Sequence, residues 1–174
     1  MLESNTLPIV WFSHCIPKHA FVMWLLMGER LKTQDRLKSW ELKYNPILKC
    51  SLCKGCMDSH AHLFFECSFS TQVWKKVKDL MIINVGTNNW KVCRDLLVAG
   101  TTRQSAKGVV DNLCFAASVY FLWQERNNRL FNKPSSSVDQ LFELIRSTVR
   151  LKLMTVTFKS SMIVTRIKEV WQLS

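Results

Sequence analysis

Four of the seven cysteines and two of the four histidines of this 174-residue chain lie in one short window. The window holds a Cys-x2-Cys pair at Cys50 and Cys53, followed by His62 and Cys67, five residues apart. Zinc prefers four tetrahedral nitrogen and sulfur ligands, and a Cys-x2-Cys turn places two thiolates on one side of the ion. The spacing therefore predicts one Cys3His zinc site made of Cys50, Cys53, His62 and Cys67.

The same window allows other ligand sets. Cys56 forms a second Cys-x2-Cys pair with Cys53, and His60 could replace His62. Ordinary buried thiols are the simplest alternative, but a second pair of ligand residues close to the first favours zinc. Spacing alone leaves the exchange of Cys56 or His60 into the site open.

The predicted site is structural rather than catalytic, because four protein ligands leave no coordination position for water. The sequence contains no His-x-Glu of the zinc deaminases, no His-Glu-x-x-His and no Gly-x4-Gly-Lys phosphate loop. It also lacks the nucleophile elbow that would bring Ser, His and Asp together. We therefore expect no enzymatic activity.

Hydrophobic periodicity predicts helices on both sides of the window. Residues 20–40 indicate two short helices, broken near 28–33, with Thr33 as the N-cap of the second. The apolar face of the first comprises Phe21, Trp24, Leu25 and Gly28. After the window, an amphipathic helix capped by Ser70 carries Val73, Trp74, Val77, Leu80 and Met81.

The second half of the chain indicates further helices. Residues 109–131 are strongly apolar and predict a long buried helix. A linker at 132–137 precedes a capping box of Ser137 and Gln140, and the helix behind it carries Val138, Leu141, Phe142, Ile145 and Val149. The β-branched content of 162–171 leaves a helix or a strand open there.

These elements predict a mainly α fold in two parts. A loop at 84–89 marks the boundary between them. We expect a small helical zinc-binding module at 8–83 and a helical C-terminal region at 84–174.

The composition describes a basic, folded chain. It has 24 Lys+Arg against 13 Asp+Glu, a net charge of +11, and 48% hydrophobic residues, which excludes a disordered chain. The longest apolar stretches, 20–27 and 113–123, are shorter than the roughly 18 residues of a membrane span, and the N-terminus has no secretory signal. We expect an intracellular protein, nuclear or cytoplasmic, without a membrane partner or small-molecule substrate.

Basic side chains surround the predicted zinc site. Lys and Arg neutralise phosphates, and the net charge of +11 favours non-specific binding of RNA or DNA. The alternative is that these residues are solvated helix faces. The candidate contacts are Lys18, Arg30, Lys32, Arg36, Lys38, Lys49, Lys54, Lys75, Lys76 and Lys78. We expect the tryptophans in the core rather than stacked on bases, because they fall on apolar stripes.

Together the motifs resemble the zinc-binding domain of plant non-LTR (LINE-type) reverse transcriptases, over about residues 8–80. The resemblance rests on the runs 16–24 and 31–37, on Cys-x2-Cys and His-Leu-Phe-Phe-Glu-Cys, and on Val73-Trp74. It implies one structural Zn²⁺, with Cys56 and His60 as non-ligands and with the ligands Cys50, Cys53, His62 and Cys67. More loosely, Trp123-Gln-Glu-Arg-Asn127, with Arg129 and Phe131, resembles a segment that often follows this domain.

The resemblance also bears on function. The polymerase of this family uses an Asp-Asp pair, which this sequence lacks, so we expect a detached piece without polymerase activity. The first functional reading is an accessory module that binds RNA or DNA. The alternatives are a structural or protein-interaction module, in which self-association could occur, and a transposon remnant without a present function.

Overall fold

A computed structural model describes residues 7–36, 49–81, 92 and 105–173. The predicted contact Lys38, the continuation of the helix after Thr33 and the loop at 84–89 lie outside these residues. The α-helices are α1 (Leu7–Val10), α2 (Pro17–Met27), α3 (Ser68–Lys78), α5 (Ala106–Leu130), α6 (Val138–Leu153) and α7 (Met162–Trp171). The structure also describes two short helical elements, the 3-10 turn η1 (Gln34–Arg36) and the π turn η2 (His62–Glu66). The mainly α prediction is confirmed.

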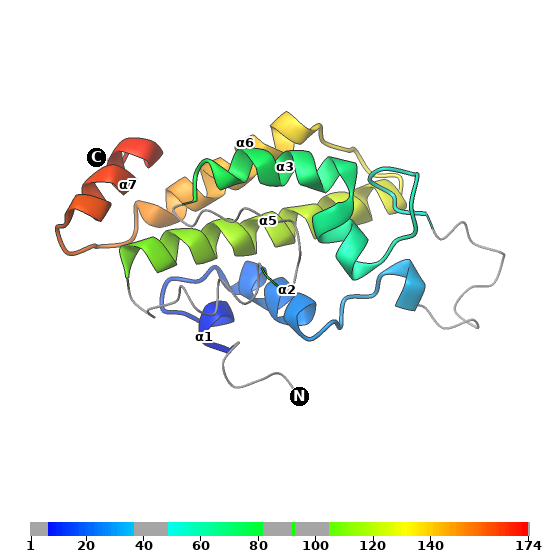
Figure 1. Ribbon diagram of the computed structural model, residues 1–174, viewed down its shortest axis with the longest axis horizontal. Coiled ribbons are helices and arrows are strands. Elements are labelled where there is room, and N and C mark those ends of the chain that lie inside the picture. The colour runs from blue at the N-terminus through cyan, green and yellow to red at the C-terminus, as the bar shows by residue number, and fades with distance from the viewer. Residues whose placement is uncertain (1–6, 37–48, 82–91, 93–104, 174) are drawn as a thin grey trace.

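Helix α5 is the axis of the molecule (Figure 1). It packs against α2 on one side and against α3 and α6 on the other. Its residues are buried almost continuously from Gly108 to Val119, because neighbours cover more than one face. The apolar run at 109–131 therefore predicted this helix to within three residues at its start and one at its end.

The predicted apolar face of α2 is wrong. Phe21 is 51% exposed, and the buried side chains are instead those of His19, Ala20, Val22, Met23, Leu26 and Met27. Apolar residues lie all around this helix, so periodicity could not identify the buried face. Packing against α1 and α5 selects it.

The predicted cap of α3 is also wrong. The helix begins at Ser68 and has Cys67 as its N-cap residue, without a side-chain cap bond. Ser70 lies inside the first turn, where its hydroxyl donates to the carbonyl oxygen of Leu63 at 2.5 Å. Its side chain thus ties α3 to η2 instead of capping a helix.

Helices α6 and α7 each begin directly after a serine that caps them. The Ser137–Gln140 capping box is present at the start of α6, and Leu141, Ile145 and Val149 are buried as predicted. Residues 162–171 form α7, whose N-cap Ser161 accepts a hydrogen bond from the amide of Val164. This settles the choice between helix and strand.

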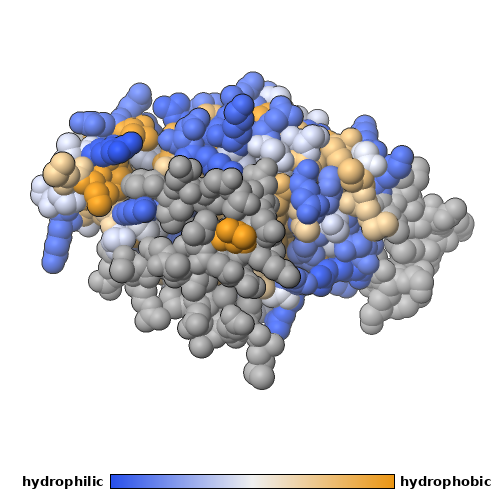
Figure 2. Space-filling model, in the orientation of Figure 1, coloured by the Kyte–Doolittle hydropathy of each residue, from blue (hydrophilic) through white to orange (hydrophobic). Residues whose placement is uncertain are grey.

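The surface is unevenly polar. Figure 2 shows hydrophilic side chains along the upper part of the molecule, over α3 and α6, and hydrophobic ones near α7. Met162 and Ile163 are exposed at the start of α7. Among the described helices, none is long and apolar enough to span a membrane.

Candidate metal centre

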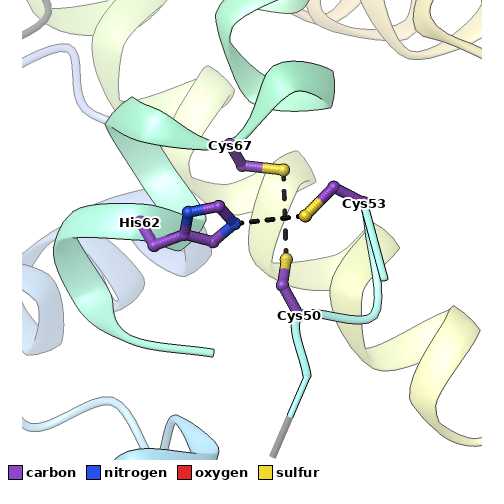
Figure 3. Close-up of side chains that lie close together, drawn as sticks. All are labelled: Cys50, Cys53, His62 and Cys67. Atoms are coloured by element: carbon purple, nitrogen blue, oxygen red, sulfur yellow. Dashed lines mark hydrogen bonds between the residues drawn. The ribbon is translucent and has the colours of Figure 1, made fainter. Parts of the chain in front are cut away.

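The side chains of Cys50, Cys53, His62 and Cys67 converge on one point (Figure 3). Their potential ligand atoms all lie within 4.8 Å of one another. The sulfur atoms of Cys50 and Cys67 are 3.9 Å apart, and the Cys53 sulfur is 3.3 Å from Nε2 of His62. The structure thus brings together the four residues that the sequence and its family resemblance predicted as ligands.

The two shorter separations fit a tetrahedral zinc site. Zn–S bonds of about 2.3 Å and Zn–N bonds of about 2.0–2.1 Å imply S···S edges of about 3.8 Å and S···N edges of about 3.6 Å. The separations of 3.9 Å and 3.3 Å each lie within a few tenths of an ångström of those edges. The donor set, three soft sulfurs and one imidazole nitrogen, is one that zinc prefers.

A tight loop, which we call the knuckle (residues 49–57), supplies the first two of these side chains. Its ends are held by an isolated β-bridge between Lys49 and Met57. The amide of Cys50 donates to the Cys56 carbonyl, and the amide of Lys54 donates to the Cys50 carbonyl, both at 2.7 Å. Lys54 has a positive φ of 58°, which turns the chain directly after Cys53.

The π turn η2 supplies the other two. Its wider winding spaces His62 and Cys67 by one turn, and the amide of Cys67 donates to the carbonyl oxygen of His62 at 2.7 Å. The Ser59 hydroxyl accepts from the amide of His62 and holds the start of the turn. π turns are rare and are frequently found at functional sites.

An aromatic cluster supports the turn from behind. Leu63, Phe64 and Phe65 are buried. The indole nitrogen of Trp74 donates to the Phe64 carbonyl oxygen at 2.6 Å, and the Phe64 ring stacks on Trp123 of α5 with centroids 6.5 Å apart. The turn that presents His62 and Cys67 is therefore fixed by packing on both α3 and α5.

The two buried thiols differ in acidity. The Cys50 thiol donates to the Cys67 sulfur, and this bond lowers the pKa of Cys67 to about 5. The same bond, with burial, raises the pKa of Cys50. A thiolate already favoured at Cys67 suits a cluster that takes up a metal cation, since the thiolate is the ligand form.

The two alternative residues lie outside the cluster. The side chain of Cys56 is exposed, and its backbone carbonyl holds the knuckle instead. His60 is buried, with Nδ1 3.3 Å from the Thr33 hydroxyl, and burial lowers its pKa. Neither residue joins the group of four.

Sequence reasoning missed a buried ion pair beside the centre. Nη2 of Arg126 lies 2.5 Å from Oδ2 of Asp58, and both side chains are almost completely buried. The same oxygen accepts the amide of Gln34 at 3.0 Å. One carboxylate thus joins the knuckle, η1 and α5.

The last turns of α5 make further bonds to the knuckle. The Ser51 hydroxyl donates to the Arg126 carbonyl at 3.0 Å, and Nη1 of Arg129 donates to the Leu52 carbonyl at 2.9 Å. Arg129 also pairs with the buried Glu125 at 2.7 Å. The segment Trp123–Asn127 resembled a segment that often follows this domain, but that resemblance did not predict any contact with the knuckle.

The predicted nucleic-acid contacts do not form one surface. Figure 1 places α2 and α3 on opposite sides of α5, so the cations of 18–36 are separated from those of 75–78. Arg36 pairs with Glu29 at 2.6 Å, and Lys76 pairs with Asp139 at 2.9 Å. Lys78 is half-buried; the other described candidates are exposed, namely Lys18, Arg30, Lys32, Lys49, Lys54 and Lys75.

Comparison with known proteins finds one family match, to the first part of the chain. Residues 2–74 match the family described as zinc-binding in reverse transcriptase. No curated protein and no solved structure matches the chain. The family and the cluster of four side chains are together consistent with one structural zinc site. The match ends inside α3, so α5, α6 and α7 lie beyond it.

Proposed function

We propose that this chain, whose residues 2–74 carry a reverse-transcriptase zinc-binding domain, is a non-catalytic module that binds RNA or DNA without sequence preference. The observation that carries the proposal is the Cys3His cluster. Its four protein donors would fill the coordination shell of Zn²⁺ and leave no position for a reacting water. The metal would act as a cross-link, and Cys50, Cys53, His62 and Cys67 would hold it.

The four residues of the cluster come from two separate segments of the chain. Cys50 and Cys53 belong to the knuckle, whereas His62 and Cys67 flank a turn that packs on α3 and α5. A cross-link between the two fixes the knuckle on the helical core. The exposed lysines of the knuckle, Lys49 and Lys54, are thereby presented in a defined place.

The charge supports a polyanionic partner. The net charge of +11 raises the local concentration of nucleic acid around the protein. Lysines contact phosphates as point charges and read no sequence, so binding is sensitive to salt and indifferent to base order. The resemblance to plant non-LTR reverse transcriptases supports a retrotransposon origin for such a module.

Titration of labelled RNA and DNA tests this function. The zinc-loaded chain is mixed with single-stranded RNA, single-stranded DNA and duplex DNA of two unrelated sequences, and fluorescence anisotropy is recorded. We expect binding that weakens by at least about tenfold between about 50 mM and about 200 mM salt, equally for both sequences. Absence of binding at the lower salt, or binding that salt does not change, would contradict the proposal.

A second candidate function, protein–protein contact in the form of self-association, is favoured by exposed apolar side chains at the C-terminal helices. Leu151, Met154 and Met162 are 64%, 55% and 91% exposed. Exposed apolar side chains are available for contacts with another protein surface. Sedimentation of the same zinc-loaded sample separates the two functions, because self-association depends on protein concentration in the absence of nucleic acid.

A further inference from the structure

A cleft of about 780 Å³ lies between the knuckle and the end of α5. One wall is formed by the knuckle and the other by the last turn of α5 and the linker behind it. Among the described residues, its lining contains four cationic side chains and no carboxylate. The cations are Lys49, Lys54, Arg129 and Lys133.

The two walls are held in place by hydrogen bonds. Ser51 and Leu52 of the knuckle are tied to Arg126 and Arg129 of α5, as described above. Asn132 has a positive φ of 53°, and the amide of Lys133 donates to the Asn128 carbonyl at 2.8 Å. This left-handed turn at the end of α5 brings Lys133 to the cleft.

The charge of the cleft is only partly compensated. Glu125 balances Arg129, whose three bonded N–H groups fix the guanidinium to Glu125, Leu52 and Ser136. Within the part of the chain that the structure describes, Lys49, Lys54 and Lys133 form no ion pair. A concave surface lined by one sign of charge focuses its field and attracts counter-ions.

We propose that this cleft binds the phosphodiester backbone of a single nucleic-acid strand. The inference rests on the proposed function and gives it a location. The cleft joins two lysines that the sequence had marked as candidates, Lys49 and Lys54, to Arg129 and Lys133, which lie beyond the family match. Its volume is in the range of pockets that enclose small ligands, so it can accept a short stretch of strand.

Charge reversal at the two walls tests the site. The cleft variant, Lys54→Glu/Lys133→Glu, reverses the charge of one cation in each wall. The distant variant, Lys159→Glu/Lys168→Glu, makes the same change in net charge at two exposed positions before and within α7. Each zinc-loaded protein is titrated into labelled single-stranded RNA of about 20 nucleotides. We expect the cleft variant to bind at least about tenfold more weakly and its salt slope to fall by about one or more. The distant variant should lose less than about threefold.

The outcomes separate this inference from the proposed function. If the wild-type chain binds and both variants weaken equally, net charge alone acts and the cleft is not the site. If the wild-type chain does not bind, the proposed function fails and the inference with it. If the Lys54→Glu/Lys133→Glu variant loses zinc, Lys133→Gln is tested alone, because Lys133 lies far in the sequence from the zinc ligands. Unchanged binding of RNA by Lys133→Gln then overturns the inference, and a loss of about threefold supports it.

Discussion

Asp58 is the residue on which three segments of the structure meet. Its carboxylate pairs with Arg126 of α5 and accepts the amide of Gln34, and its carbonyl oxygen accepts the amide of Asp35. A buried carboxylate is costly unless its charge is paired, and Oδ2 makes both contacts of this one, since Oδ1 has no hydrogen-bond partner among the described residues. This side chain therefore couples the knuckle to both of its neighbours.

Asp58→Asn is expected to destabilise the fold strongly. The substitution leaves the buried guanidinium of Arg126 without its counter-charge, which costs about 3 kcal/mol or more. The matched control is Glu29→Gln, which breaks the exposed pair with Arg36 and should cost less than about 1 kcal/mol. Urea unfolding of both zinc-loaded variants measures the difference. Equal effects of the two substitutions would show that Asp58 does not join these segments.

His19 makes the stability of the fold sensitive to acid. It is buried against Tyr120 and Phe121, and its two ring nitrogens have no hydrogen-bond partner among the described residues. Burial, and to a smaller extent the positive charge of Lys18, lower the pKa of His19 from 6.5 to about 4. The neutral form is therefore favoured in the folded state, and the unfolded chain binds the proton more readily.

His19→Leu should remove this part of the pH dependence. The stabilising contribution of the neutral imidazole is complete above pH 6.5 and is lost as the pH falls from 6.5 towards 4, because unfolding then takes up a proton. The free energy of unfolding of the wild type should thus fall more steeply over this window than that of the variant. Parallel curves between these pH values would contradict the assignment, and the plateau above pH 7 provides the internal reference.

At the residue scale, the sequence predicted the metal cluster better than its surroundings. A Cys-x2-Cys pair and a nearby His and Cys can be recognised from spacing, because a tetrahedral ion imposes that spacing. Asp58 and Arg126 are 68 positions apart. No local pattern joins such residues, so their pairing became visible only when the fold placed them together.

At the scale of elements, helices were predicted where local chemistry determines them. The run at 109–131 and the capping box at Ser137 are signals contained in the element itself. The buried face of α2 and the start of α3 depended on neighbours. No sequence pattern used above predicted the π turn. It brings His62 and Cys67 to the knuckle.

Ser137→Ala tests the cap of α6. In the capping box, the Ser137 hydroxyl accepts from the Gln140 amide at 3.2 Å, and the Gln140 side chain accepts from the Ser137 amide at 2.8 Å. Loss of the hydroxyl should lower the free energy of unfolding by about 1 kcal/mol. Ser147→Ala, at an exposed position within α6, provides the control and should change stability by less. A Ser137 effect no larger than the Ser147 effect would indicate that the cap does not stabilise the fold.

At the scale of the whole molecule, the zinc-binding segment and the C-terminal helices share one core. The family match ends at residue 74, yet α5 packs on α2, α3 and η2 and bonds to the knuckle. The cleft exists only because these two parts meet. The division of the chain into two domains at residue 84 stays a prediction. Many interactions connect the residues before this boundary to those after it.

The Cys3His cluster can hold this fold together only if it binds a metal ion. The most direct measurement is the zinc content per chain of protein purified without added metal, compared with Cys50→Ser/Cys67→Ser and with Cys56→Ser. We predict one zinc in the wild type and in the Cys56 variant, and neither zinc nor cooperative unfolding in the double variant. A well-folded wild-type chain without zinc, or loss of zinc on changing Cys56 alone, would contradict the Cys3His centre.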